Sequence, residues 1–163
     1  MTRSAGAAGD LQSSAPSACE GSCLCGAVRY QLLRDPLTVY ACHCTDCQRR
    51  TGSAFALSML VVREAVDLIQ GDPTTYFAKF ADGRTKHGRM CSFCGTRLWG
   101  EPLRNKAILV IQPGNLDRGN EFQPVAHQWT RSALPWIVFP PGVTLYPTQP
   151  DDPKELIRLW RGR

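Results

Sequence analysis

The chain has 163 residues, with 19 Lys and Arg against 14 Asp and Glu, a formal net charge of +5, and eight cysteines. This length fits a single domain that buries its own core. The basic residues are scattered, which argues against a nucleic-acid-binding surface, and no run approaches the roughly 20 apolar residues of a membrane span. We therefore expect no nucleic acid and no membrane among the partners, while a small anionic molecule stays compatible with the charge.

The N-terminal stretch is rich in Ala, Ser and Gly and holds one large aliphatic residue, Leu11, after the initiator Met. Such a segment cannot offset the entropy that is lost on ordering. We expect a disordered tail over residues 1–18, a folded domain over residues 19–147 and a C-terminal extension over residues 148–163. The stretch lacks a signal-peptide pattern, which predicts a cytoplasmic protein with reduced thiols.

Alternating apolar and polar residues predict a mainly β domain of about eight to ten strands with few short helices. The predicted strands cover residues 27–33, 37–41, 53–62, 66–69, 75–80, 84–90, 97–100 and 107–112. Between the second and third strands, Thr45 or Asp46 is expected to cap a short helix that Gly52 ends. The Asp82-Gly83 pair predicts a hairpin turn.

The last third of the chain is dense in proline, at positions 140, 141, 147, 150 and 153. Proline at this density excludes a central strand or a long helix. We expect an extended segment that wraps the β core. The apolar residues Leu156, Ile157 and Trp160 predict one amphipathic turn near its end.

Seven cysteines fall into three short motifs, Cys23-x-Cys25, Cys42-x-Cys44-x-x-Cys47 and Cys91-x-x-Cys94. Thiols this close in sequence are typical of ligands to one soft metal ion, and zinc is the default because it is redox-inert and accepts tetrahedral sulfur ligands. The first and last motifs offer two sulfurs each, so together they predict one closed structural site. We expect the first pair on one face of a strand and the last in a zinc knuckle, with Gly95 in a left-handed conformation.

The central motif offers three sulfurs, whereas a structural zinc takes four protein ligands and a catalytic zinc commonly keeps an open position. Cys19, His43 or His127 would close the site and make it structural. Spacing alone favours the open site only slightly. His43 lies between two ligands, so its ring is expected to point away from the metal, and Cys19 is otherwise a free thiol.

The order of motifs resembles a known family. The residues that carry the resemblance are Gly21-x-Cys23-x-Cys25-Gly26 with Val28-Arg29-Tyr30, Cys42-His43-Cys44-x-x-Cys47-Gln48-Arg49 with Gly52 and Phe55, Phe93-Cys94-Gly95, and His127-x-Trp129 with Ser132 and Pro135-Trp136. In this order they resemble the glutathione-dependent formaldehyde-activating enzyme family over about residues 19–143. The chain has Gly21-Ser22 where a Gly-Gly is common, a departure that leaves the metal motifs intact.

The resemblance implies a β-tent fold with a zinc-ribbon-like core and two zinc ions. One is a structural zinc on Cys23, Cys25, Cys91 and Cys94, and the other is a catalytic zinc on Cys42, Cys44 and Cys47. The open position of the second would take the thiol of glutathione, which adds to formaldehyde to give S-hydroxymethylglutathione, a carbon–sulfur lyase type of reaction. The substrate pocket would be lined by Arg49, or its neighbour Arg50, with His127, Trp129, Ser132 and Trp136.

Three other functions fit parts of the sequence. A methionine sulfoxide reductase of related fold needs a redox cysteine in a late strand, but no cysteine follows Cys94. A zinc-stapled binding module without catalysis predicts a closed second site. A metal or thiol sensor would have the open site but no turnover.

Overall fold

The computed structural model describes residues 19–80 and 83–163, so the predicted tail over residues 1–18 lies outside the described part. It is mainly β, as predicted. The strands are β1 (Cys19–Ser22), β2 (Arg29–Leu32), β3 (Thr38–Cys42), β4 (Ala56–Val62), β5 (Val66–Gln70), β6 (Thr74–Lys79), β7 (Thr85–Met90), β8 (Arg97–Glu101), β9 (Ile108–Ile111), β10 (Ala126–Gln128) and β11 (Thr144–Tyr146). The helices are α1 (Thr45–Thr51) and α2 (Lys154–Arg161), with short 3-10 turns η1 (Arg63–Ala65), η2 (Pro113–Asn115), η3 (Gly119–Glu121) and η4 (Thr130–Ser132). None of the helices in this part of the chain is long and apolar enough to cross a membrane.

The predicted helix forms after β3 and ends where expected. Gly52 takes a left-handed conformation with φ of 66°, and its N–H donates to the Gln48 carbonyl at 2.8 Å. The cap was predicted wrongly, because the residue at the N-cap is Cys44, whose sulfur accepts from the Cys47 N–H at 3.4 Å. A thiolate therefore takes the place that a hydroxyl or carboxylate usually holds.

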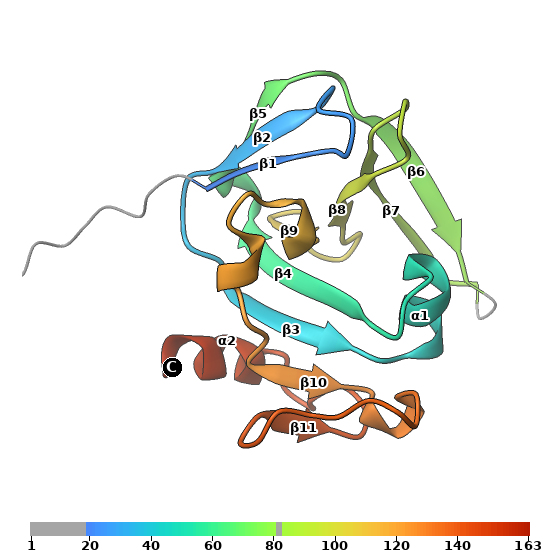
Figure 1. The fold of residues 1–163 in the computed structure, drawn as a ribbon, viewed down its shortest axis with the longest axis vertical. Helices are drawn as coiled ribbons and strands as arrows, with labels where there is room; N and C mark the ends of the chain where they lie inside the picture. Colours follow the sequence, from blue (N-terminus) through green and yellow to red (C-terminus); the bar gives the residue numbers. More distant parts are fainter. Residues whose placement is uncertain (1–18, 81–82) are drawn as a thin grey trace, which may run out of the picture.

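Two sheets make up the fold (Figure 1). The smaller sheet has the order β1-β2-β5, and the larger has the order β11-β10-β3-β4-β9-β8-β7-β6. Neighbouring strands are antiparallel, except that β10 runs parallel to both β3 and β11. In Figure 1 the large sheet curves so that β6 and β7 come round toward α1, and the ion pair between Arg84 and Asp46 at 3.2 Å joins these two parts.

The core fills the space between the sheets. Tyr30 of β2 is fully buried and meets Trp99 of β8 edge to face, with ring centroids 5.5 Å apart. From the large sheet the core also takes alternate residues of three strands, Val39, Met59, Val61, Leu109 and Ile111. The residues between them face the other side of the sheet, which leaves that side free to line a cavity.

The C-terminal segment packs on this framework. Its predicted amphipathic turn is the two-turn helix α2, with Leu156 and Trp160 buried. The hydroxyl of Thr38 in β3 donates to the Leu156 carbonyl at 2.8 Å, inside the protein. Helix α2 thus packs against β3, and Trp160 joins the core cluster that contains Val39.

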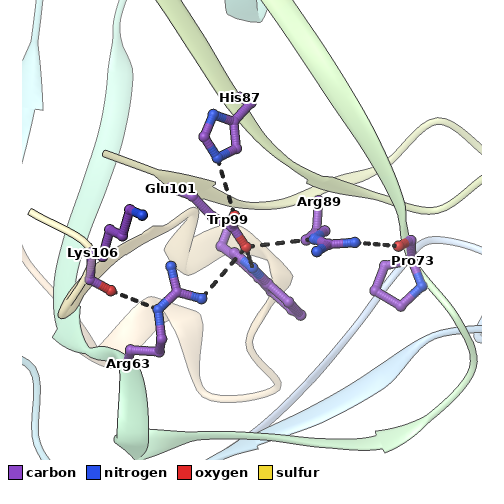
Figure 2. A network of polar contacts seen from close by, with 7 residues as sticks. All are labelled: Arg63, Pro73, His87, Arg89, Trp99, Glu101 and Lys106. Carbon is purple, nitrogen blue, oxygen red and sulfur yellow. Dashed lines mark hydrogen bonds and ion pairs between the residues drawn. The ribbon is translucent and has the colours of Figure 1, made fainter. Parts of the chain in front are cut away.

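A network of polar contacts around Glu101 ties β7, β8 and η1 together (Figure 2). The Glu101 carboxylate, 14% exposed, lies 3.2 Å from His87 Nε2, 3.6 Å from the Arg63 guanidinium and 3.5 Å from that of Arg89. Trp99 Nε1 donates to it at 3.4 Å. Partial burial raises the pKa of Glu101, but the Trp99 hydrogen bond and the two guanidinium groups outweigh burial and hold that pKa below its ordinary value.

We expect Glu101→Gln to lower the free energy of unfolding by about 1–2 kcal/mol at pH 7, because the amide keeps the shape but loses the charged acceptor. The pKa of Glu101 is lower in the folded protein than in the unfolded chain. The stability that Glu101 contributes is therefore fully present above its unfolded-state pKa and is lost as the pH falls through its folded-state pKa. The difference between wild type and variant should therefore shrink below about pH 4.5. Urea denaturation from pH 7 to pH 4 measures it. The exposed pair of Glu121 and Arg118 offers the control, because Glu121→Gln should change stability much less, and equal losses would contradict the prediction.

Candidate functional site

The first candidate metal site lies between the two sheets, because it takes two cysteines from the small sheet's side and two from a turn of the large sheet. Cys23 and Cys25 lie in the turn before β2, and Cys91 and Cys94 lie in the turn between β7 and β8. Their four sulfur atoms lie within 4.8 Å of one another, with 3.5 Å between Cys23 and Cys25 and 3.7 Å between Cys25 and Cys91. Zn–S bonds of about 2.3 Å in a tetrahedron place sulfurs about 3.8 Å apart. These cysteines therefore fit a metal ion closely, although the first pair lies in a turn and not on the predicted strand.

Backbone and hydroxyl donors surround these sulfurs. The Val28 N–H donates to Cys23 Sγ at 3.3 Å, and the Thr96 hydroxyl lies 3.1 Å from Cys94 Sγ. The contact with Thr96 lowers the pKa of Cys94 to about 5. Gly95 has φ of 69°, as predicted for the knuckle. Such donors favour the ionised thiols that a metal ion requires.

The second group forms where β3 passes into α1. Cys42 ends the strand, Cys44 caps the helix, and Cys47 lies in the helix with its side chain buried. The three sulfurs also lie within 4.8 Å of one another, and Cys42 donates to Cys44 at 3.6 Å. The hydrogen bonds with Cys42 and Cys47 lower the pKa of Cys44 to about 2, while the hydrogen bonds with Cys44 and Cys47 raise the pKa of Cys42.

These three residues fit three ligands of one metal ion. Among residues 19–80 and 83–163, the compact metal-binding group at this place consists of the three cysteines alone. Cys19 lies in β1 of the other sheet, with its sulfur 3.7 Å from the Glu20 carbonyl. The other two residues that would close the site, His43 and His127, contact each other instead.

The two histidines form a buried pair behind the cysteines. His43 Nε2 lies 2.9 Å from His127 Nδ1, and the rings stack between Phe55 and Phe139. Burial lowers the pKa of His43, with His127 adding to the effect, and burial lowers the pKa of His127 as well. Both imidazoles are therefore neutral at pH 7, and their outer nitrogens, His43 Nδ1 and His127 Nε2, are buried with no hydrogen-bond partner among the described residues.

The turn that carries the cysteines is fastened to the loop after β10. The Gln48 side chain donates to the His43 carbonyl at 2.7 Å and to the Ser132 carbonyl at 2.8 Å. The Ser132 hydroxyl donates to the same His43 carbonyl at 3.0 Å. In that loop Trp129 takes a left-handed conformation with φ of 59°, which costs of order 1–3 kcal/mol for a residue other than glycine. The Trp129 side chain packs against the small cluster of Cys42, Cys47 and Ala56.

A cavity of about 640 Å³ opens beside the three cysteines on the face of the large sheet opposite to the core. Its floor consists of residues that alternate with the core residues along the strands, namely Tyr40, Ser58, Leu60, Ile108, Val110 and Gly100. The wall is formed by α1 with its cysteines and by the loop around Trp129 and Ser132. The site therefore combines three sulfur ligands with room for a molecule much larger than formaldehyde.

The family model described as glutathione-dependent formaldehyde-activating enzyme matches residues 18–132, well over half of the chain. The chain belongs to this family. The resemblance seen in the cysteine motifs is thereby confirmed.

Two further comparisons place the family member among known proteins. A curated protein of Halomonas elongata, named "Putative glutathione-dependent formaldehyde-activating enzyme", is 30% identical over 84 residues, which cover 49% of this chain and 54% of that protein. The match thus spans about half the length of this curated relative. A crystal structure of a Rhodobacter sphaeroides protein is 17% identical with a TM-score of 0.46, covering 78% of this chain and 98% of that one.

The pocket residues expected from the family resemblance fall into two groups. Trp129 and Ser132 line the cavity beside the cysteines. The other three do not: Arg49 is exposed on α1, His127 lies buried behind the site, and Trp136 is 66% exposed on the surface. Arg50, the alternative to its neighbour, does line the cavity.

Sequence reasoning missed a set of polar side chains that β6, β7 and the later loops bring to this family member's cavity. These are Tyr76, Arg84, Lys86, Gln112, Gln128, Arg131 and Gln149. They come from segments more than 20 residues from the cysteine motif in sequence. The curvature of the large sheet brings the residues of β6 and β7 to the cysteines, and the pairing of β10 with β3 brings Gln128 and Arg131. Period-two patterning carries no signal for either.

Two glycines lie opposite each other on β7 and β8 near the Tyr76 hydroxyl, and only one of them lacks room for a side chain. A Cβ at Gly88 would lie 2.1 Å from the Trp99 carbonyl oxygen and 2.8 Å from the Tyr76 hydroxyl. A Cβ at Gly100 would meet nothing closer than the Tyr76 hydroxyl at 3.8 Å. The two positions face each other across the strand pair but differ in the space above them.

We expect Gly88→Ala to destabilise the protein by about 3 kcal/mol or more, because backbone must shift to accept the methyl group. Gly100→Ala should leave stability unchanged or raise it by up to about 1 kcal/mol, because the unfolded chain loses freedom. Denaturation curves of the matched pair measure both effects. Equal losses in the two variants would contradict the geometry described for this strand pair.

Proposed function

We propose that this protein adds a thiol, glutathione or a close analogue, to a small aldehyde, with zinc bound by Cys42, Cys44 and Cys47. The observation that carries the proposal is a group of three sulfur ligands in the wall of a cavity, with no fourth ligand supplied by the described residues. Two zinc ions are proposed in all, and the other is a structural ion on Cys23, Cys25, Cys91 and Cys94. Membership in the family supports both substrates.

Zinc at a three-cysteine site supplies a position where a substrate thiol is held as its nucleophilic thiolate near neutral pH. In the overall reaction the thiol sulfur bonds to the carbonyl carbon, the carbonyl π electrons move to oxygen, and the proton lost from sulfur is regained at that oxygen. The product is a hydroxymethyl thioether, and its breakdown is the carbon–sulfur lyase direction.

The chain's own groups hold this arrangement in place. Gln48 and Ser132 fix the turn that carries Cys42 and Cys44, and the buried pair of His43 and His127 fills the space behind it. Trp129 covers the cysteines on the cavity side. Fixed ligands of this kind reduce the reorganisation that accompanies reaction.

The test follows the rate at which formaldehyde and glutathione combine, by NMR, with and without the zinc-loaded protein. The protein should raise the rate above the spontaneous reaction in proportion to its concentration. Glutathione should also perturb the absorption of protein whose second site holds cobalt. A rate equal to the spontaneous one, with a cobalt spectrum indifferent to every thiol tried, would overturn the proposal.

One observation favours a second candidate, a zinc-stapled binding module. Leu24 and Phe93 are 88% and 85% exposed at the tips of the two turns that carry the four-cysteine site. Exposed apolar side chains of this size are typical of contact surfaces. A binding module would still bind its protein partner after loss of the metal ion at the three cysteines. The proposed enzyme would lose its activity under the same treatment.

A further inference from the structure

The cavity wall around the three cysteines carries an excess of positive charge. Its lining includes the cations Arg50, Arg84, Lys86 and Arg131 and the acids Asp46 and Glu101. Both acids already have partners. Asp46 pairs with Arg84 at 3.2 Å, and Glu101 pairs with Arg63 and Arg89, which do not line the cavity. Within residues 19–80 and 83–163 no carboxylate forms an ion pair with Arg50, Lys86 or Arg131.

Lys86 is one of these cations in the cavity wall. It lies in β7, with its ammonium group 5.3 Å from the centre of the Phe80 ring, and it lines the cavity together with Cys42, Cys44 and Cys47. Arg50 lies on the last turn of α1, half-buried, and lines the same wall.

We propose that Lys86 and Arg50 select the thiol by its carboxylate groups, so that the cavity binds an anionic thiol in preference to a neutral one. The proposal rests on the thiol binding proposed above. A thiol bound at the cysteines adds negative charge beside three thiolates, which opposes binding of an anion unless cations offset it. Lys86 and Arg50 supply that compensation, and a charge-assisted contact to a carboxylate supplies the preference.

The experiment compares two matched thiols on the zinc-loaded protein by calorimetry, glutathione and its diethyl ester, which lacks both carboxylate charges. We expect wild type to bind glutathione at least about tenfold more tightly than the ester, and Lys86→Gln to weaken glutathione about tenfold while leaving the ester unchanged. Lys86→Arg should restore the preference. Lys154→Gln, which removes the same charge from the exposed start of α2, should change neither affinity.

The outcomes separate this inference from the function on which it rests. If Lys86→Gln weakens glutathione and the ester equally, Lys86 only balances the charge of the metal centre and the selection by carboxylate is wrong. Equal affinities of wild type for the two thiols would overturn it too. If no thiol binds to wild type, the proposed function itself fails and the inference with it.

Discussion

Replacing Cys91 with serine is expected to unfold most of the chain in buffer. Cys91 is fully buried, and its group joins the turn before β2 to the turn between β7 and β8, which lie far apart in sequence. A structural zinc contributes on the order of 10 kcal/mol to folding, which is comparable with the whole stability of a domain. Serine does not ionise near neutral pH, so the ligand is lost and the site with it.

Circular dichroism and urea denaturation of the Cys91→Ser variant, purified with zinc, provide the measurement. Cys19→Ser is the matched control, because Cys19 is also a buried cysteine but lies outside both metal-binding groups. It should stay folded and lose no zinc. A Cys91→Ser variant as stable as the Cys19→Ser variant would mean that the four cysteines bind no structural metal.

The cysteine spacing was enough to predict both metal-binding groups before any fold was known. Sulfurs two or three residues apart in a turn must converge, and this local constraint holds whether Cys23 lies on a strand, as predicted, or in the turn where it is found. The same local logic placed the end of α1 at Gly52, because only a residue without a Cβ takes that conformation easily. Local chemistry therefore sets the three-cysteine group and each half of the four-cysteine group, whereas the meeting of the two halves, 66 residues apart, depends on long-range packing.

The cavity could not be predicted from the sequence in this way, because long-range packing creates it. The strands β10 and β11 are three residues long and lie in a proline-rich segment, so alternation gives them no signal. Yet the parallel pairing of β10 with β3 places the loop of Trp129 beside the cysteines. His127 looked like a pocket residue beside its aromatic neighbours. Its burial against His43 depends on which strand lies next to β3, which a single sequence does not specify.

Cys44→Ser is expected to remove the second metal ion and abolish thiol addition while the fold survives. The structure gives a specific reason for that separation. Cys44 caps α1 through its sulfur, and serine is among the best N-cap residues, so its hydroxyl can accept the Cys47 N–H in the same place. Its hydroxyl cannot serve as a thiolate ligand, however, and two cysteines bind zinc far more weakly than three.

Zinc per chain should therefore fall from about two in wild type to about one in Cys44→Ser, one ion for each cysteine group. Thermal unfolding should change by no more than a few degrees, which corresponds to about 1 kcal/mol. Thiol-dependent addition to the aldehyde should drop to the spontaneous rate. Thr45→Ser, at the exposed neighbouring position, controls for the local change and should keep both ions. If Cys44→Ser retained a second zinc and full activity, the reaction would have to occur elsewhere in the protein, because no other group of described residues near this cavity offers three converging ligands.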